Sequence, residues 1–197
     1  MAISRTPVFK RCNYLGIDPL VLGYAHKPSI RRTKTTNRRR KQSVYARQLI
    51  EKQKLRFIYG VLEKQFRLIY ARAEKIDGIT GENLLTLLER RFDNTIFRLG
   101  LSTTRREGRQ LINHGHLMLN GKRVGIPSVT LKVGDVISVQ EKSKQAFRSR
   151  KLAQNRKIPA WLEFDEDKLE AKVVSLPLRS DIDYDVTESA VVELYSK

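Results

Sequence analysis

The residues with the clearest chemical potential are three arginines at the start of one expected helix. Arg105, Arg106 and Arg109 follow Thr104, which has the spacing of a helix N-terminal capping box with Glu107. Cations near a helix N-terminus oppose the helix dipole by about 0.3–1 kcal/mol each when exposed. A bound phosphate would remove this conflict, because it accepts hydrogen bonds from guanidinium groups and from free helix N–H groups. The spacing predicts a phosphate-binding helix; the alternative is a charged surface helix that Glu107 partly compensates.

A tight hairpin is expected shortly after this helix. Residues 117–119 and 122–124 have strand composition, and Asn120-Gly121 between them is typical of a type I′ turn. Lys122 and Arg123 would then be exposed hydrogen-bond donors at the hairpin tip. We expect them to lie beside the arginine helix and to extend the same cationic surface.

Metal and thiol chemistry have little support in the sequence. His114 and His116 lie close together, but the pattern supplies neither a cysteine nor a third ligand nearby. We interpret both histidines as turn residues that contact backbone or RNA. Cys12 is the single cysteine and cannot form an internal disulfide or a cysteine-rich zinc site. We therefore expect no metal, no cofactor and a reducing, cytosol-like compartment.

The charge of the chain limits its partners. The 197 residues carry a formal net charge of +18, which attracts phosphate polymers or anionic membranes. No apolar run is long enough to cross a bilayer, and the first residues lack the apolar centre of a secretory signal. Residues 1–56 hold fifteen Lys/Arg and two Asp/Glu, whereas residues 160–197 hold four and ten. This asymmetry predicts that one end faces a polyanion and the other faces away or covers a basic partner.

Two stretches of helical periodicity precede the arginine helix. Ser43 can cap a helix that continues to about Ile76, with one apolar stripe at three- and four-residue steps. Lys52, Lys54 and Arg56 lie mainly off this stripe, so we expect contacts to a phosphate backbone; ordinary solvated lysines are the alternative. A second helical face begins at residues 80–83 and continues to Leu99, with Gly100 as its stop and Arg90, Arg91 and Arg98 outside the apolar face.

Short strands and one basic helix are expected in the remainder. Residues 129–131, 136–139 and 173–178 have strand composition, and residues 141–157 have helical composition. Trp161 is more typical of a core anchor than of a stacking platform. Apolar side chains near the end of the chain could dock on the long helix; these are Val191, Val192, Leu194 and Tyr195.

The first 42 residues show no sustained period. They include the basic run Arg38-Arg39-Arg40-Lys41 and little apolar surface to offset the entropy of ordering. We expect an irregular basic arm that orders on a partner; a disordered tail or a localisation signal is the alternative. Apolar residues between Tyr14 and Leu22 indicate that part of the arm folds.

Residues 90–139 resemble the helix-helix-sheet RNA-binding module named after ribosomal protein four of the small subunit. Several families share this module, so further motifs are needed to separate them. From Ser43 to the C-terminus the chain is similar to the bacterial form of that ribosomal protein family. The motifs that carry this similarity are Glu51-Lys52-Gln53-Lys54, Ile58-Tyr59-Gly60-Val61-Leu62-Glu63 with Gln65-Phe66, Thr80-Gly81-Glu82-Asn83-Leu84-Leu85, Pro159-Ala160-Trp161-Leu162 and Val192-Glu193-Leu194-Tyr195-Ser196-Lys197.

The resemblance implies a structural rRNA-binding protein in the cytoplasmic ribosome. It implies early binding to the 5′ domain of 16S rRNA, contact with neighbouring small-subunit proteins, an effect on decoding accuracy and a place near the mRNA entry path. It matches Arg38 to Lys41 to the family's entry-site position. The candidate rRNA-binding residues, from the residues and the resemblance together, are Arg38, Arg39, Arg40, Lys41, Lys52, Lys54, Arg56, Arg105, Arg106, Arg109, Gln110, His114, His116, Lys122 and Arg123.

The predicted fold class is α+β, with a mostly helical domain, a helix-helix-antiparallel-sheet module and the basic arm. The expected domains are residues 1–42, residues 43–89 with 176–197, and residues 90–175. Two departures from the family stand out: Cys12 alone cannot supply the zinc-binding cysteine cluster of some members, and Gly108 stands where alanine is common.

Two other functions compete with this interpretation. An RNA-modifying enzyme such as a pseudouridine synthase could carry the same module, but the rest of the chain shows no convergent acid, base and nucleophile. We therefore expect no catalytic residues. A DNA-binding protein would need a recognition helix in its usual context, and a membrane-bound one would need a basic stripe backed by an exposed apolar face. We find neither pattern, so we expect no membrane partner.

Overall fold

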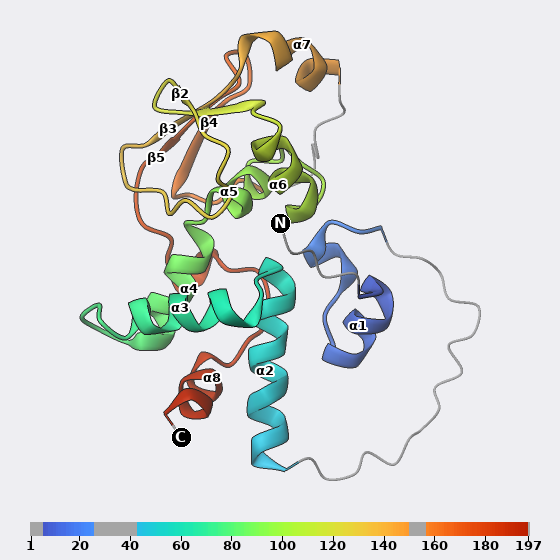
Figure 1. Cartoon of the computed structure of the whole chain (residues 1–197), viewed down its shortest axis with the longest axis vertical. Helices are drawn as coiled ribbons and strands as arrows, with labels where there is room; N and C mark the ends of the chain where they lie inside the picture. Colours follow the sequence, from blue (N-terminus) through green and yellow to red (C-terminus); the bar gives the residue numbers. More distant parts are fainter. Residues whose placement is uncertain (1–5, 26–42, 150–156, 197) are drawn as a thin grey trace. The chain divides into compact units, whose positions relative to one another are not determined.

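A computed structural model describes residues 6–25, 43–149 and 157–196 (Figure 1). The described residues form helices and one small antiparallel sheet, which confirms the α+β class. None of the helices in this described part combines the length and apolarity needed to cross a bilayer.

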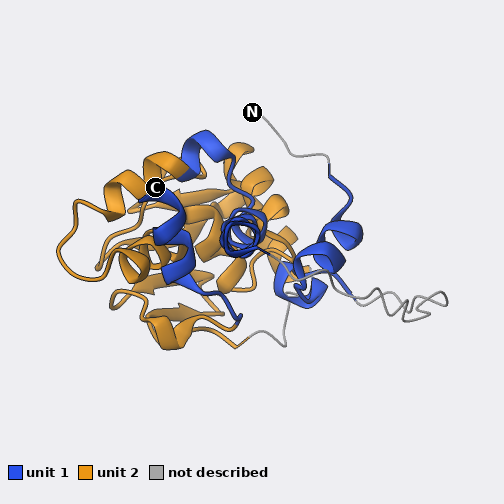
Figure 2. Cartoon of the chain, turned by 90° about the horizontal axis from the view of Figure 1, so that it is seen from below, with its two compact units in different colours: residues 1–66, 184–197 blue, residues 67–183 orange. Residues whose placement is uncertain are grey.

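The chain divides into two compact units, coloured separately in Figure 2. Unit 1 is Met1–Phe66 with Tyr184–Lys197, and unit 2 is Arg67–Asp183. Residues 67–89 and 176–183 thus group with the sheet, whereas the domains drawn from the sequence assigned them to the helical part.

Unit 2 is built on a five-stranded antiparallel sheet with strand order β2-β1-β3-β5-β4. The expected hairpin is confirmed, because Leu119 pairs with Lys122 and both turn residues, Asn120 and Gly121, have positive φ angles of 50° and 74°. The strands are β1 (Leu117–Leu119), β2 (Lys122–Arg123), β3 (Val136–Val139), β4 (Leu162–Asp165) and β5 (Glu170–Val173).

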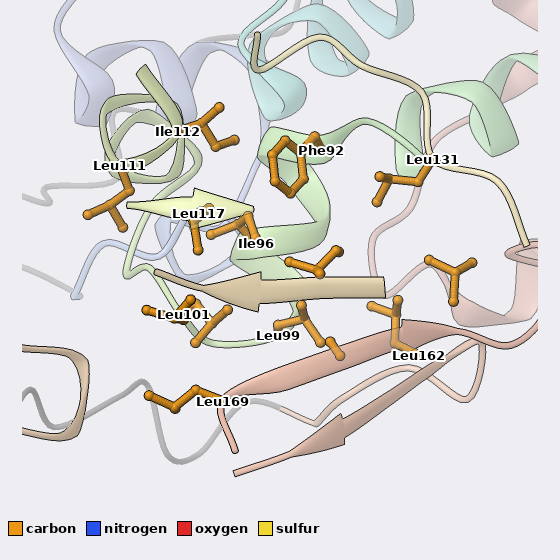
Figure 3. Close-up of a cluster of buried hydrophobic side chains, with 14 of the residues drawn as sticks. Phe92, Ile96, Leu99, Leu101, Leu111, Ile112, Leu117, Leu131, Leu162 and Leu169 are labelled. Carbon is orange, nitrogen blue, oxygen red and sulfur yellow. The ribbon is translucent and has the colours of Figure 1, made fainter. Parts of the chain in front are cut away.

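Helices of unit 2 cover one face of this sheet with apolar side chains. Figure 3 shows Phe92, Ile96 and Ile112 from two of these helices next to Leu117 of β1. Trp161 belongs to the same core and is 1% exposed, which confirms it as a core anchor. The helices that contribute side chains to this core are α5 (Phe92–Arg98), α6 (Arg105–Asn113) and α7 (Glu141–Ser149). Unit 2 also contains α4 (Thr80–Glu89) and a short 3-10 turn, η2 (Arg179–Asp181).

Two strand predictions were wrong in detail. Residues 129–131 form only an isolated antiparallel bridge, Thr130 with Arg91, in which Leu131 N donates to Arg90 O at 2.8 Å and Phe92 N to Val129 O at 2.9 Å. The strand expected at 173–178 lies at 170–173 instead. Strand β4 was missed, although Leu162-Glu163-Phe164-Asp165 alternates apolar and acidic residues as a half-buried strand does.

The single long helix expected from Ser43 is two helices. Ser43 caps α2 (Val44–Tyr59), as expected, with its Oγ accepting from Ala46 N at 3.2 Å. Gly60 then adopts a φ of 61°, a left-handed conformation that favours glycine and ends the helix. The amide of Val61 donates to Arg56 O at 2.9 Å, and α3 (Glu63–Ala73) begins two residues later.

Unit 1 contains folded structure inside the arm that was expected to be irregular. α1 (Val8–Leu15) and the 3-10 turn η1 (Pro19–Leu22) are ordered, because Cys12, Leu15 and Leu22 are buried. The prediction that part of the arm folds between Tyr14 and Leu22 is confirmed, and the helix that begins at Val8 was not expected; Arg38 to Lys41 lie outside the described residues.

The end of the chain docks on the long helix α2, as expected. α8 (Glu188–Tyr195) packs against α2 and buries Val191 completely. A hydrogen bond of 2.7 Å from Gln48 Nε2 to Glu193 Oε2 links the two helices.

Candidate nucleic-acid interface

The arginine helix α6 begins as the sequence predicts. Thr104 is its N-cap, and its Oγ1 accepts a hydrogen bond from Glu107 N at 3.2 Å. The reciprocal contact is shifted by one residue, since Glu107 Oε2 accepts from the backbone N and the Oγ1 of Thr103, both at 2.7 Å. Glu107 thus satisfies part of the helix start from within the protein.

Two of the three arginines point toward the protein rather than toward solvent. Arg105 is 5% exposed; its Nε donates to Asn94 Oδ1 at 2.8 Å, and its guanidinium carbon lies 4.2 Å from the centroid of the Phe97 ring. Arg109 Nε donates to Asp93 Oδ2 at 2.6 Å. The three arginines therefore do not form one phosphate-facing surface, as the sequence had indicated, because Arg105 and Arg109 join α6 to α5.

A buried polar cluster at the start of α5 receives these arginines. Asp93 is 1% exposed and also accepts from Arg91, at 3.1 Å from Nε and 3.0 Å from Nη2. Asn94 donates to Glu89 Oε2 at 2.7 Å, and Glu89 in turn pairs with Arg98 at 2.8 Å. Arg91 and Arg98 lie outside the apolar core, as expected, but they are buried, because their charges pair with these acids.

Sequence reasoning missed this cluster, and a signal for it was present. Asp93 and Asn94 lie between the apolar residues Phe92 and Ile96 of an expected helical face. Glu89 lies four residues before Asp93 and five before Asn94. Buried charges require partners, so acids and arginines sharing one apolar segment indicate an internal network.

The exposed candidates lie on the outer side of α6 and on the hairpin. Arg106, Gln110, His114, Lys122 and Arg123 are all exposed. Arg123 Nη2 donates to the carbonyl oxygen of His114 at 3.1 Å, so the hairpin strand β2 is joined to the end of α6. We call these five exposed residues the α6–hairpin surface.

Gly115 allows this close approach of the hairpin to α6. Its φ is 75°, and a Cβ at this position would lie 1.9 Å from Arg123 Nε. Any side chain would therefore displace the Arg123 guanidinium, besides straining the backbone. His116 is half-buried, and its Nδ1 lies 2.9 Å from Ser143 Oγ of α7, which ties α7 to the same region.

The cations of α2 are held by acids of their own unit. Lys52 Nζ lies 3.0 Å from Glu63 Oε1, and Arg56 Nη1 lies 2.7 Å from Glu63 Oε2. Lys54 Nζ lies 2.6 Å from Glu51 Oε1. All three side chains are only partly exposed, so any contact to RNA would compete with these ion pairs.

Glu63 makes this part of unit 1 sensitive to acid. Partial burial alone would raise the pKa of Glu63, but hydrogen bonds from Lys52 and Tyr195 and the charges of Lys52 and Arg56 outweigh it and lower the pKa. A carboxylate with a lowered pKa stabilises the fold above its ordinary pKa, and this contribution is lost as pH falls through the lowered value.

We expect Glu63→Gln to lower the melting temperature at pH 7, and this effect should shrink as the pH falls and Glu63 itself becomes protonated. The loss at pH 7 should be below about 1 kcal/mol, because the pair is partly solvated. Thermal denaturation of both proteins as a function of pH measures the difference. A difference in melting temperature that stays constant with pH would show that the charge of Glu63 does not cause the loss of stability.

Within residues 6–25, 43–149 and 157–196, His, Cys, Asp and Glu form no group of three or more that could hold a metal ion. Cys12 is fully buried, and this burial, helped by the charge of Asp18, raises the pKa of its thiol.

Two protein-family models match adjacent parts of the chain. A family model for the "Ribosomal protein S4/S9 N-terminal domain" matches residues 5–89, and one for the "S4 domain" matches residues 90–137. The second match contains α5, α6 and the hairpin. The chain belongs to the ribosomal protein S4 family.

Curated relatives support the family over the whole chain. "Small ribosomal subunit protein uS4" of Lachnospira eligens is 51% identical, and the protein of that name in Fusobacterium nucleatum is 47% identical; both alignments cover 100% of each chain. "Small ribosomal subunit protein uS4A" of Clostridium acetobutylicum is 56% identical over 81% of this chain and 78% of its own. The similarity thus extends well before Ser43, where we had expected it to begin.

Gly108, the departure noted within α6, has a packing reason. A Cβ at Gly108 would lie 3.1 Å from the carbonyl oxygen of Asp93 and 3.1 Å from Ser102 Oγ. The glycine lets α6 approach the start of α5 closely, where Arg105 and Arg109 make their contacts. The lower helix propensity of glycine is therefore offset by this approach.

Proposed function

We propose that this chain is a structural rRNA-binding protein of the small ribosomal subunit in the cytoplasm, and not an enzyme. The observation that carries the proposal is the full-length similarity, at about half identity, to relatives named small ribosomal subunit protein uS4. The alternative of a pseudouridine synthase is not supported, because these names denote ribosomal structural proteins.

We further propose that the RNA is the 5′ domain of 16S rRNA and that binding occurs early in subunit assembly. The α6–hairpin surface would meet RNA phosphates through Arg106, Lys122 and Arg123, supported by Gln110 and His114. The net charge of +18 supports this role, since release of counterions favours binding to a folded polyanion. Lys52, Lys54 and Arg56 would contribute where RNA phosphate displaces their acidic partners.

Contacts to neighbouring small-subunit proteins, an effect on decoding accuracy and a place near the mRNA entry path are part of the same proposal. Ten acidic residues between 160 and 197 suit a basic protein neighbour. Arg38 to Lys41 would face mRNA at the entry path.

Gradient sedimentation of a cell lysate tests the function. We expect the chain to co-migrate with small ribosomal subunits, and to stay with them at high salt, because a structural component is held by many contacts. Recovery at the top of the gradient at low salt, free of small subunits, would overturn the proposal.

A further inference from the structure

Helix α1 has an exposed face that none of the candidate residues uses. It buries Cys12 and Leu15 on one side and exposes Lys10, Asn13 and Tyr14 on the other. The Tyr14 ring is 66% exposed, which is high for a large aromatic side chain. A cation, an amide and an aromatic ring at helical spacing therefore form one solvent-facing group.

The ring of Tyr14 is backed by an anchored guanidinium group. The guanidinium carbon of Arg11 lies 5.3 Å from the centroid of the Tyr14 ring, within the range of a cation–π contact. Arg11 is held in turn by Gln53 of α2, whose Oε1 accepts from Arg11 Nη2 at 3.2 Å. Gln53 also accepts from Arg56 Nη1 at 3.1 Å, so this amide is itself fixed. The chain of contacts restricts how the ring can move.

We propose that Tyr14, backed by Arg11, is a stacking site for an unpaired base of RNA. The inference rests on the proposed function and adds a base-binding residue to it. Unpaired bases stack on exposed aromatic rings, and positive charge beside the ring holds the flanking phosphates. Lys10 and Asn13 supply such donors on the same face.

Charge favours RNA over a protein as the occupant of this face. Lys10 and Arg11 place two cations on the helix that carries Tyr14, and residues 1–56 as a whole carry fifteen Lys/Arg against two Asp/Glu, so this end of the chain attracts a polyanion. The neighbouring exposed side chains, Lys10 and Asn13, are polar, whereas the centre of a protein interface is depleted of charge.

A pair of substitutions tests the ring separately from its hydroxyl group. Tyr14→Phe keeps the aromatic face, and Tyr14→Leu keeps apolar bulk without it. We expect Tyr14→Phe to bind a 16S rRNA 5′-domain fragment within about twofold of the unchanged chain, and Tyr14→Leu to bind about 5- to 150-fold more weakly. The salt dependence of binding should be the same for all three proteins, because no charge is removed.

Controls separate failure of this inference from failure of the proposed function. Melting curves should coincide for the three proteins, since Tyr14 is exposed, and Tyr14→Leu should bind a fully paired RNA duplex as the unchanged chain does. Equal binding of the fragment by Tyr14→Leu, or an equal loss on the duplex, would overturn the stacking site alone. If the unchanged chain binds the fragment no better than an unrelated RNA, the proposed function fails, and the stacking site fails with it.

Discussion

Replacing Asp93 with asparagine should destabilise unit 2 by about 3–5 kcal/mol, the usual result of breaking a buried ion pair. Asp93 Oδ2 lies 3.0 Å from Arg91 Nη2 and 2.6 Å from Arg109 Nε, and the carboxylate is 1% exposed. Asparagine has nearly the same shape but no charge, and its amide group would face guanidinium donors. Both arginines would lose their shared counter-charge. Thermal denaturation of the full chain should show a melting temperature lower by roughly 10–20 °C.

Asp77→Asn is the matched control for this prediction. Asp77 belongs to the same unit and is exposed, so the same chemical change should shift stability by no more than about 0.5 kcal/mol. A double-mutant cycle with Arg109→Gln should give a coupling energy of about 1 kcal/mol or more, because the two side chains share one hydrogen bond. Equal melting temperatures for Asp93→Asn and Asp77→Asn would show that the cluster does not hold α5 and α6 together.

Local signals predicted the elements that depend on local chemistry. Asn120-Gly121 predicted the hairpin, since both residues tolerate the positive φ angles that a type I′ turn requires. Ser43 and Thr104 predicted two helix starts, since their hydroxyl groups bond the first free amides. The end of α2 at Gly60 was not predicted, because periodicity alone continues across a single left-handed residue.

The orientation of the three arginines of α6 depends on tertiary contacts, and their spacing in the sequence predicts only part of it. Arg105 and Arg109 stand four residues apart, and Ile112 follows three residues later on the same side, facing the core. Arg106 and Gln110 stand four apart on the other side and are exposed. Judged by residue type alone, all three arginines were equal candidates for phosphate binding. The partners on α5 decide that two of them are internal: Asn94 accepts from Arg105, and Asp93 accepts from Arg109. These partners lie 11 and 16 residues away, too far for a local pattern to show them.

The division into internal and exposed cations predicts which side chains cause the salt dependence of RNA binding. Replacing Arg106, Lys122 and Arg123 together with Gln should flatten the slope of log affinity against log salt by about 2–3, because each lost phosphate contact removes close to one unit. Affinity for the rRNA 5′-domain fragment at 0.1 M salt should fall roughly 100-fold or more. Melting curves should change little, since these side chains are exposed. Binding measured across a salt series gives both quantities.

Two further variants show whether the change in the salt slope comes from the positions of the three side chains or only from their charge. Replacing Lys75, Lys168 and Lys172 with Gln removes the same net charge from exposed positions outside α6 and the hairpin, and should change the slope by less than one unit. Replacing Arg105 and Arg109 with Gln should instead lower the melting temperature, because their contacts to Asn94 and Asp93 are lost. If the folded Arg105/Arg109 variant flattened the slope as much as the first triple variant does, these two guanidinium groups would have to leave their internal partners for phosphate. The α6–hairpin surface would then extend across α6 to its inner side.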